Sequence, residues 1–276
     1  MSRSVTPWAL AQISDFHIVE PGKLVGDLVD TAQYLRSAVA FLNALTTRPI
    51  GVLASGDLVN GGRVEEYRHL RELLLPLELP LWLMVGNHDD RDAIRSVFPD
   101  HPELGTQGQI DYVLPGDADA EQTSPAVVVL DSVIPGAPAG RLMRAQLSWL
   151  EDQLAQLSPR PTIVALHHPP FATGIGHMDG IGLDAGSVEG LRDVLARHHH
   201  VQRLTCGHLH RSIVTRFAGT VAATVPSTAH AVAFDLEPGA RGTLTFEPPA
   251  VTMHVATAGG IVTHTLPIGI HPQHDF

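Results

Sequence analysis

The first two-thirds of the chain alternates short apolar runs with amphipathic helical patterns. The apolar runs suit strands covered on both faces and span residues 8–14, 50–55, 81–85, 126–131, 162–167 and 203–206. Between them, apolar residues recur at three- and four-residue steps, which predicts helices over 27–45, 64–75, 90–97, 144–157 and 187–199. This alternation restricts the chain to βαβ units built around a largely parallel sheet.

The pattern changes after about residue 212. Six β segments with turn residues between them are predicted at 213–217, 220–225, 231–236, 242–246, 251–257 and 261–266. The pair Gly259-Gly260 is typical of a hairpin turn, and residues 117–125 of a polar loop. We therefore expect a core over residues 1–217, and a β-rich segment over 218–276 that completes a second sheet.

Composition excludes several classes of partner. A chain of 276 residues with 44% hydrophobic residues can bury a large α/β core. Its net charge of −11 argues against binding to nucleic acid and to anionic membranes. No apolar run reaches the roughly 18 residues of a membrane-spanning helix. The single cysteine, Cys206, and the lack of a signal-peptide pattern favour a cytoplasmic protein.

Polar residues follow five of the predicted strands at the point where each strand ends. They are Asp15, His17, Asp57, Asn87, His88, His167, His168, His208 and His210. Because the carboxyl ends of parallel strands meet at one edge of a sheet, these side chains should converge. Carboxylate, amide and imidazole ligands without a thiolate suit ions such as Mn, Fe, Zn or Co.

Each of these motifs alone is weak evidence, because a single histidine is more often a surface or core residue than a ligand. The complete set, in order at successive strand ends, predicts a metal centre. Three of the clusters follow a glycine, at Gly56, Gly86 and Gly207, which permits a sharp turn and a close backbone approach.

The motifs together resemble those of the calcineurin-like metallophosphoesterase superfamily over roughly residues 8–215. In order they are Asp15-x-His17, Gly56-Asp57, Gly86-Asn87-His88-Asp89, His167 and Gly207-His208-x-His210. The stretches "SGDLVNGGRVEEY", "GNHDD" and "HHPP" are similar to class III cyclic-nucleotide phosphodiesterases and bacterial glycerophosphodiesterases. The resemblance implies a four-layer α-β-β-α sandwich of two mixed sheets flanked by helices, with a pair of metal ions.

The resemblance also assigns the ligands. One ion would be held by Asp15, His17 and His210, the other by Asn87, His167 and His208, and Asp57 would bridge them. The family pattern places one ligand two residues before the first proline of "HHPP", which selects His167 over His168. The alternation of side chains along a strand supports this choice, and His168 would then lie behind the ligand.

The implied activity is hydrolysis of small phosphodiesters, such as 3′,5′-cyclic nucleotides or glycerophosphodiesters, by a metal-bridging hydroxide. His88 would be the leaving-group acid or a charge stabiliser. Asp89 would orient His88 or a neighbouring ligand, or cap the helix at 90–97. His168, His177 and His230 are open as substrate contacts. The family branch also implies a homo-oligomer, a dimer or larger, built through the C-terminal segment.

Charge favours a diester. Two divalent ions carry four positive charges, and Asp15, Asp57 and a hydroxide balance three, which suits a phosphodiester monoanion. Only Arg63, Arg91 and Arg211 lie near the motifs in sequence. The alternatives are a phosphomonoesterase or nucleotidase and a non-catalytic scaffold, although scaffold members typically lose ligands and this chain retains them all.

Overall fold

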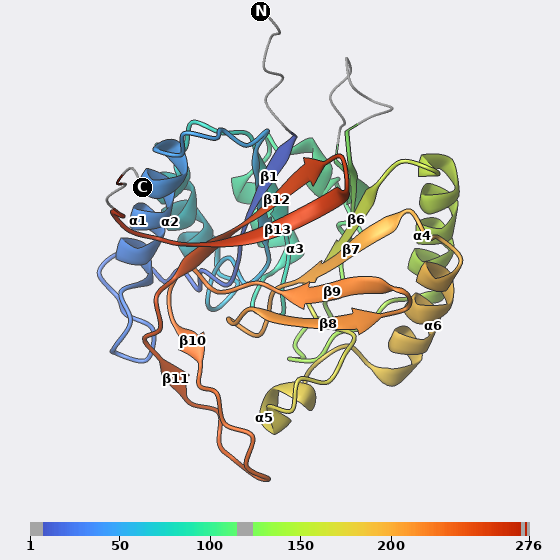
Figure 1. Ribbon diagram of the computed structural model, residues 1–276. Helices are drawn as coiled ribbons and strands as arrows, with labels where there is room; N and C mark the ends of the chain where they lie inside the picture. The colour runs from blue at the N-terminus through green and yellow to red at the C-terminus, as the bar shows by residue number, and fades with distance from the viewer. Residues whose placement is uncertain (1–7, 115–123, 272–273, 275–276) are drawn as a thin grey trace, which may run out of the picture.

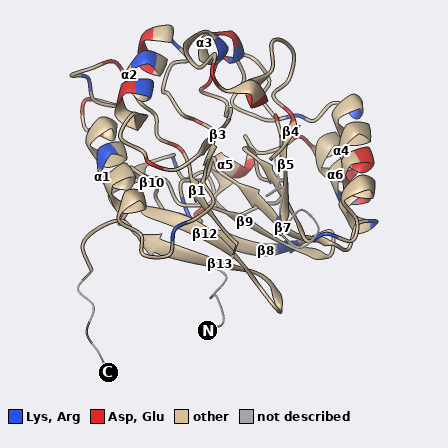
Figure 2. Cartoon of the chain, turned by 90° about the horizontal axis from the view of Figure 1, so that it is seen from above, with Lys and Arg blue, Asp and Glu red and all other residues tan. Residues whose placement is uncertain are grey.

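Two β-sheets lie face to face between two groups of helices (Figure 1). The computed structural model describes residues 8–114, 124–271 and 274. Figure 2 shows α1, α2 and α3 outside the first sheet and α4 and α6 outside the second. The four-layer α-β-β-α arrangement implied by the resemblance is therefore confirmed.

The first sheet has the strand order β13-β12-β1-β2-β3. Its parallel strands are β1 (Ala9–Ile13), β2 (Val52–Ser55) and β3 (Leu81–Met84). The hairpin β12 (Ala250–Thr257) and β13 (Gly260–Pro267) pairs antiparallel with β1. The helices α1 (Thr31–Asn43), α2 (Val64–Leu74) and α3 (Arg91–Val97) connect the parallel strands to the rest of the chain.

The second sheet has the order β4-β5-β6-β7-β9-β8. The strands β5 (Ala126–Leu130), β6 (Thr162–Leu166), β7 (Val201–Cys206) and β9 (Thr220–Thr224) are parallel. The edge strands β4 (Tyr112–Val113) and β8 (Ile213–Phe217) are antiparallel to their neighbours. The helices α4 (Arg144–Leu157) and α6 (Ala185–Ala196) cover its outer face.

Four short elements complete the described chain. The short strands β10 (Ala231–Val232) and β11 (Leu244–Thr245) pair in a hairpin that projects from the body of the molecule (Figure 1). The short helix α5 (Gly176–Asp179) lies between β6 and α6, and a 3-10 helix spans Pro102–Leu104. No described helix is long and apolar enough to cross a bilayer.

The structure differs from the sequence prediction in how the strands are distributed between the two sheets. The parallel strands belong to two sheets, not one. The strands after residue 212 do not form a sheet of their own, because β8 and β9 extend the second sheet and the β12–β13 hairpin extends the first. Pairing with β12 satisfies the backbone groups along the free edge of β1, which would otherwise be unpaired inside the protein.

The predicted strands at 231–236 and 242–246 are each reduced to two residues. A hairpin without a third strand has few partners to hold it, which explains the shortening. The predicted polar loop at 117–125 lies largely outside the described residues. The division of the chain into 1–217 and 218–276 stays a prediction.

Candidate metal centre

The carboxyl ends of five strands from both sheets meet at one site. The first sheet contributes the residues after β1, β2 and β3, and the second contributes those after β6 and β7. The backbone N–H of His208 donates to Asp15 Oδ1 at 3.0 Å, and that of His88 donates to Asp57 Oδ1 at 2.9 Å. Residues almost 200 positions apart in sequence are thereby brought into contact.

The first group comprises Asp15, His17, Asp57 and His210, all buried, with ligand atoms within 4.8 Å of one another. The Nε2 atoms of His17 and His210 are 3.1 Å apart, and His210 Nε2 is 3.6 Å from Asp15 Oδ1. The Nδ1–H of His210 donates to the carbonyl of His230 at 3.0 Å, which leaves its Nε2 lone pair facing the group.

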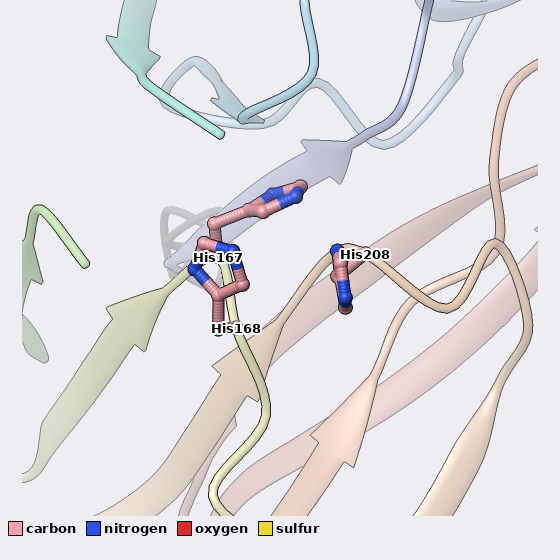
Figure 3. Close-up of side chains that lie close together, drawn as sticks. All are labelled: His167, His168 and His208. Atoms are coloured by element: carbon pink, nitrogen blue, oxygen red, sulfur yellow. The ribbon is translucent and has the colours of Figure 1, made fainter. Parts of the chain in front are cut away.

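The second group comprises His167, His168 and His208, whose rings lie beyond the ends of β6 and β7 (Figure 3). Asp57 of the first group also lies next to the second group. Its Oδ2 atom is 3.4 Å from His167 Nε2 and 3.6 Å from His17 Nε2. One carboxylate oxygen is therefore within reach of a cation held by either group.

Hydrogen bonds distinguish the two adjacent histidines of "HHPP". Both ring nitrogens of His168 have partners, with Nδ1 2.8 Å from Ser132 Oγ and Nε2 3.2 Å from the carbonyl of Pro138. His167 donates its Nδ1–H to the carbonyl of Ser55 at 2.9 Å, and its buried Nε2 has no partner among the described residues. The geometry favours His167 as the ligand and His168 as a support behind it.

Several buried polar atoms at this site lack any hydrogen bond within the part of the chain that the structure describes. They are Asp15 Oδ2, Asn87 Oδ1, His167 Nε2 and His208 Nε2. Leaving one such atom unpaired costs about 1–3 kcal/mol. In their deprotonated forms all four can donate a lone pair, two from carboxylate or amide oxygens and two from imidazoles, so a pair of cations would satisfy them together. The donor set fits a metal centre.

The backbone at the site is strained where the ligands sit. Five of the seven expected ligands have a positive φ, at 56° for Asp15, 48° for His17, 50° for Asp57, 70° for His208 and 52° for His210. This left-handed region is unfavourable for residues other than glycine, and such residues concentrate at functional sites. The tight turns aim both side chains of Asp-x-His and His-x-His toward the site.

Two glycines allow the loops to approach one another. A Cβ atom on Gly86 would lie 2.4 Å from Asp57 Oδ1, and one on Gly207 would lie 2.3 Å from Ser14 Oγ. Any other residue would push the Asn87 loop away from Asp57, or the His208 loop away from β1. The glycine before each of these two motifs is thus required by packing.

Of the two roles expected for Asp89, the helix cap is wrong, whereas its contacts suit the orientation of neighbouring ligands. Asp90, not Asp89, caps α3 by accepting from Asp92 N and Ala93 N. Asp89 instead holds the Asp57 and Asn87 loops together, because its buried carboxylate accepts from Tyr67 Oη and from the backbone N–H groups of Leu58, Val59 and Gly86. Burial, with the nearby charge of Asp57, raises the pKa of Asp89 to about 7.

Burial keeps most of the imidazoles neutral. It is the main cause that lowers the pKa of His208 to about 3, of His210 to about 4 and of His17 well below its usual value. Neutral imidazoles are ready to bind a cation. His167 differs. Burial opposes its charged form, but the charges of Asp57 and Asp15 and the hydrogen bonds to Asp57 and Ser55 together raise the pKa of His167 to about 9. Burial also raises the pKa of Asp15 to about 7.

Two further histidines border the first group. His88 holds its Nδ1 2.7 Å from the carbonyl of Asn60, and its ring centroid is 4.6 Å from that of His17. His230, which the sequence left open, has its ring centroid 4.7 Å from that of His210, and its buried Nδ1 has no partner in the described chain. His177 packs instead against Gly242 in the loop between β10 and β11.

The arginines near the motifs are already engaged. Arg63 forms ion pairs with Glu20 and Glu66. Arg91 forms a bidentate ion pair with Asp131, at 2.6 and 2.7 Å. Arg211 lies 2.6 Å from Glu247. These pairs leave the site with little positive charge of its own.

Sequence reasoning missed the residues that support the site from behind, such as Tyr67 and Ser132. Tyr67 falls in the amphipathic pattern of α2 and Ser132 in a loop. Nothing in their local sequence context distinguishes them, because their partners Asp89 and His168 are more than 20 residues away.

Comparison with known proteins agrees with the geometry. A model of the calcineurin-like phosphoesterase family matches residues 9–212. An Arcobacter nitrofigilis protein named "Probable glycerophosphodiester phosphodiesterase GpdQ" is 33% identical, over 94% of this chain and 93% of its own. A Mycobacterium tuberculosis protein named as a cAMP/cGMP dual specificity phosphodiesterase is 32% identical, over 86% of this chain and 71% of its own.

A solved structure shares the fold. The crystal structure of a dimetal phosphatase from Danio rerio aligns with 96% of this chain and 100% of its own, with a TM-score of 0.63 at 16% sequence identity. The family match spans most of the chain and includes every strand that borders the metal-ligand cluster. The chain therefore belongs to the calcineurin-like phosphoesterase family.

Proposed function

We propose that the protein is a dinuclear metal-dependent phosphodiesterase that hydrolyses small phosphodiesters. The observation that carries this proposal is the set of four buried ligand atoms at the site that have no hydrogen-bond partner among the described residues. Membership of the phosphoesterase family supports it, as do the phosphodiesterase names of relatives about one-third identical over most of the chain.

In this proposal each ion takes ligands from both sheets. Asp15 and His17 from the first sheet and His210 from the second would hold one ion. Asn87 from the first sheet and His167 and His208 from the second would hold the other. Asp57 would serve both, since its Oδ2 atom lies near His17 and near His167. The oxygen and imidazole donors suit Mn, Fe, Zn or Co.

When bound, a pair of such ions would supply an activated water and charge neutralisation for the phosphate. The chain supplies the remaining chemistry. The Nδ1–H of His88 donates to the carbonyl of Asn60, so the ring must carry a second proton, on Nε2, to protonate the leaving alkoxide, and is neutral after giving it. Asp57 accepts the backbone N–H of His88 and so fixes the loop that carries Asn87 and His88, and Asn87 would serve as a metal ligand beside it.

A diester substrate fits the charge at the site better than a monoester. A phosphomonoester dianion needs further cationic groups, and the three nearby arginines are paired with carboxylates. The relatives are named for glycerophosphodiesters and for cyclic nucleotides, and we propose one of these two classes as the substrate. The scaffold alternative has no support, because every ligand position is retained.

We retain two further proposals from the sequence. The first is a dimer or larger homo-oligomer formed through the C-terminal segment, where β13 is an exposed edge strand and the β10–β11 hairpin carries the exposed Phe234 and Phe246. The second is a cytoplasmic location.

The activity itself is the first test. Protein loaded with Mn²⁺ should hydrolyse bis(p-nitrophenyl) phosphate at least about tenfold faster than p-nitrophenyl phosphate, measured as kcat/KM. A panel of glycerophosphodiesters and 3′,5′-cyclic nucleotides then identifies the substrate class. Asp57→Ala and His210→Ala should each lower kcat/KM by at least about a hundredfold, because each removes a ligand.

The matched control is Glu65→Ala on α2, which removes an exposed carboxylate paired only with Arg68 and should leave kcat/KM unchanged. Full activity in Asp57→Ala would contradict the mechanism. A preference for the monoester would favour the phosphomonoesterase alternative.

Adjacent histidines give the second test. His167→Ala should reduce the bound metal from two ions to one per chain, because it removes an unpartnered ligand atom. His168→Ala should keep both ions and lower the Tm, because it leaves Ser132 and Pro138 without their partner. Metal content by mass spectrometry and thermal unfolding measure the two effects, and the reverse pattern would make His168 the ligand.

The affinity for metal should depend on pH in a defined direction. His167, with a pKa of about 9, and Asp15, with a pKa of about 7, carry protons in the metal-free protein that a ligand must release. The association constant for Mn²⁺ should therefore rise about tenfold per pH unit from pH 7 to 9, and more steeply below pH 7. Calorimetry in buffers of different ionisation enthalpy counts the protons, and an affinity that is constant from pH 7 to 9 would contradict this charge distribution.

A further inference from the structure

A polar side chain lies in the middle of the otherwise apolar strand β1. Gln12 is fully buried, between Ala11 and Ile13. Its amide oxygen accepts from Thr205 Oγ1 on β7 at 2.7 Å and from His254 Nε2 on β12 at 3.0 Å. Its amide nitrogen donates to Ser55 Oγ on β2 at 2.9 Å. Gln12 therefore joins the two sheets across the core.

The donor and acceptor of each of these hydrogen bonds can be assigned by starting from Arg203. Arg203 can only donate, and its Nε–H reaches Thr263 Oγ1 at 3.2 Å. The Thr263 hydroxyl is then free to donate to His254 Nδ1 at 3.0 Å, so the proton of His254 lies on Nε2, facing Gln12. Burial and the charge of Arg203 lower the pKa of His254 to about 4, which keeps the ring neutral.

The chain of hydrogen bonds ends at the metal-ligand cluster. Ser55, which accepts from Gln12, offers its backbone carbonyl to the Nδ1–H of His167 at 2.9 Å. Gln12 also stands three residues before Asp15, and its partner Thr205 stands three residues before His208. The Gln12–Thr205 hydrogen bond thus connects β1 to β7 close to Asp15 and His208, two of the proposed ligands.

The separation of the sheets matters because each proposed ion needs ligands from both. A shift of one sheet relative to the other would move Asp15 and His17 away from His210, and Asn87 away from His167 and His208. Apolar contacts between sheets are not directional, whereas a buried hydrogen bond fixes both distance and orientation. In the described chain, Gln12 provides such bonds to both sheets at once.

We propose that Gln12 is a positioning residue of the metal centre, which sets the spacing of the two sheets through Thr205 and orients His167 through Ser55. This inference rests on the proposed dinuclear function, and goes beyond it by assigning a role to residues that touch neither metal nor substrate.

Thr205 offers the sharpest test, because two variants separate its hydroxyl from its shape. Thr205→Val keeps the volume and removes the hydrogen bond to Gln12, and Thr205→Ser keeps the hydroxyl. We expect Thr205→Val to weaken Mn²⁺ binding at least about threefold, and Thr205→Ser to stay within about twofold of wild type. Calorimetry on the full chain, stripped of metal and titrated with Mn²⁺, measures both.

A second test replaces Gln12, the residue at which these hydrogen bonds meet, by Gln12→Met. Leu10→Ala is its control. Both residues are buried on the same face of β1, and only Gln12 belongs to the hydrogen-bond chain. We expect both variants to lower the Tm of the metal-free protein, but only Gln12→Met to weaken Mn²⁺ binding, by at least about tenfold. If Gln12→Met does not fold, the Thr205 pair decides.

Equal Mn²⁺ affinity in Thr205→Val, Thr205→Ser and wild type would overturn the proposal, as would equal loss of affinity in Gln12→Met and Leu10→Ala. If wild type and all variants bind two Mn²⁺ ions with equal affinity, only this inference is refuted. A wild-type protein that binds no Mn²⁺ would refute the proposed function and this inference with it.

Discussion

The buried carboxylate of Asp57, held between imidazoles from two different sheets, is the interaction on which the rest of the structure depends. Its Oδ2 atom lies within 3.6 Å of both His17 and His167. The charge of His167 holds the pKa of Asp57 well below its usual range although burial opposes this. A charge at such a depth requires compensation. The sheets, the turns and the glycines around it all bring compensating groups to that one point.

Without metal, the site lowers the stability of the folded protein. Five ligands have unfavourable backbone angles, and four ligand atoms are buried without partners in the described part of the chain. Elsewhere the core is conventional, with apolar strands between amphipathic helices. Because a ligand that binds only the folded state stabilises it, metal binding would offset the strain at the site. The hydrogen-bond chain through Gln12 keeps the strained loops at the required distance until then.

Much of this could be predicted from sequence, because strand ends are local signals. The runs before Asp15, Asp57, Asn87, His167 and His208 predicted both the strands and the convergence of their ends. What failed depends on long-range contacts. Alternation does not reveal that β1 and β7 belong to different sheets, since each run is apolar in either case. The partners of Asp89, such as Leu58 and Tyr67, are distant in sequence, so no local pattern revealed them. The same holds for Ser132 and Pro138, the partners of His168.

The central claim is that two cations share Asp57 and that each draws ligands from both sheets. Anomalous diffraction from crystals loaded with Mn²⁺ tests it most directly. The account predicts two peaks on either side of Asp57, one contacting Asp15, His17 and His210 and the other contacting Asn87, His167 and His208. A single peak, or one held by His167, His168 and His208 without Asp57 or Asn87, would contradict it.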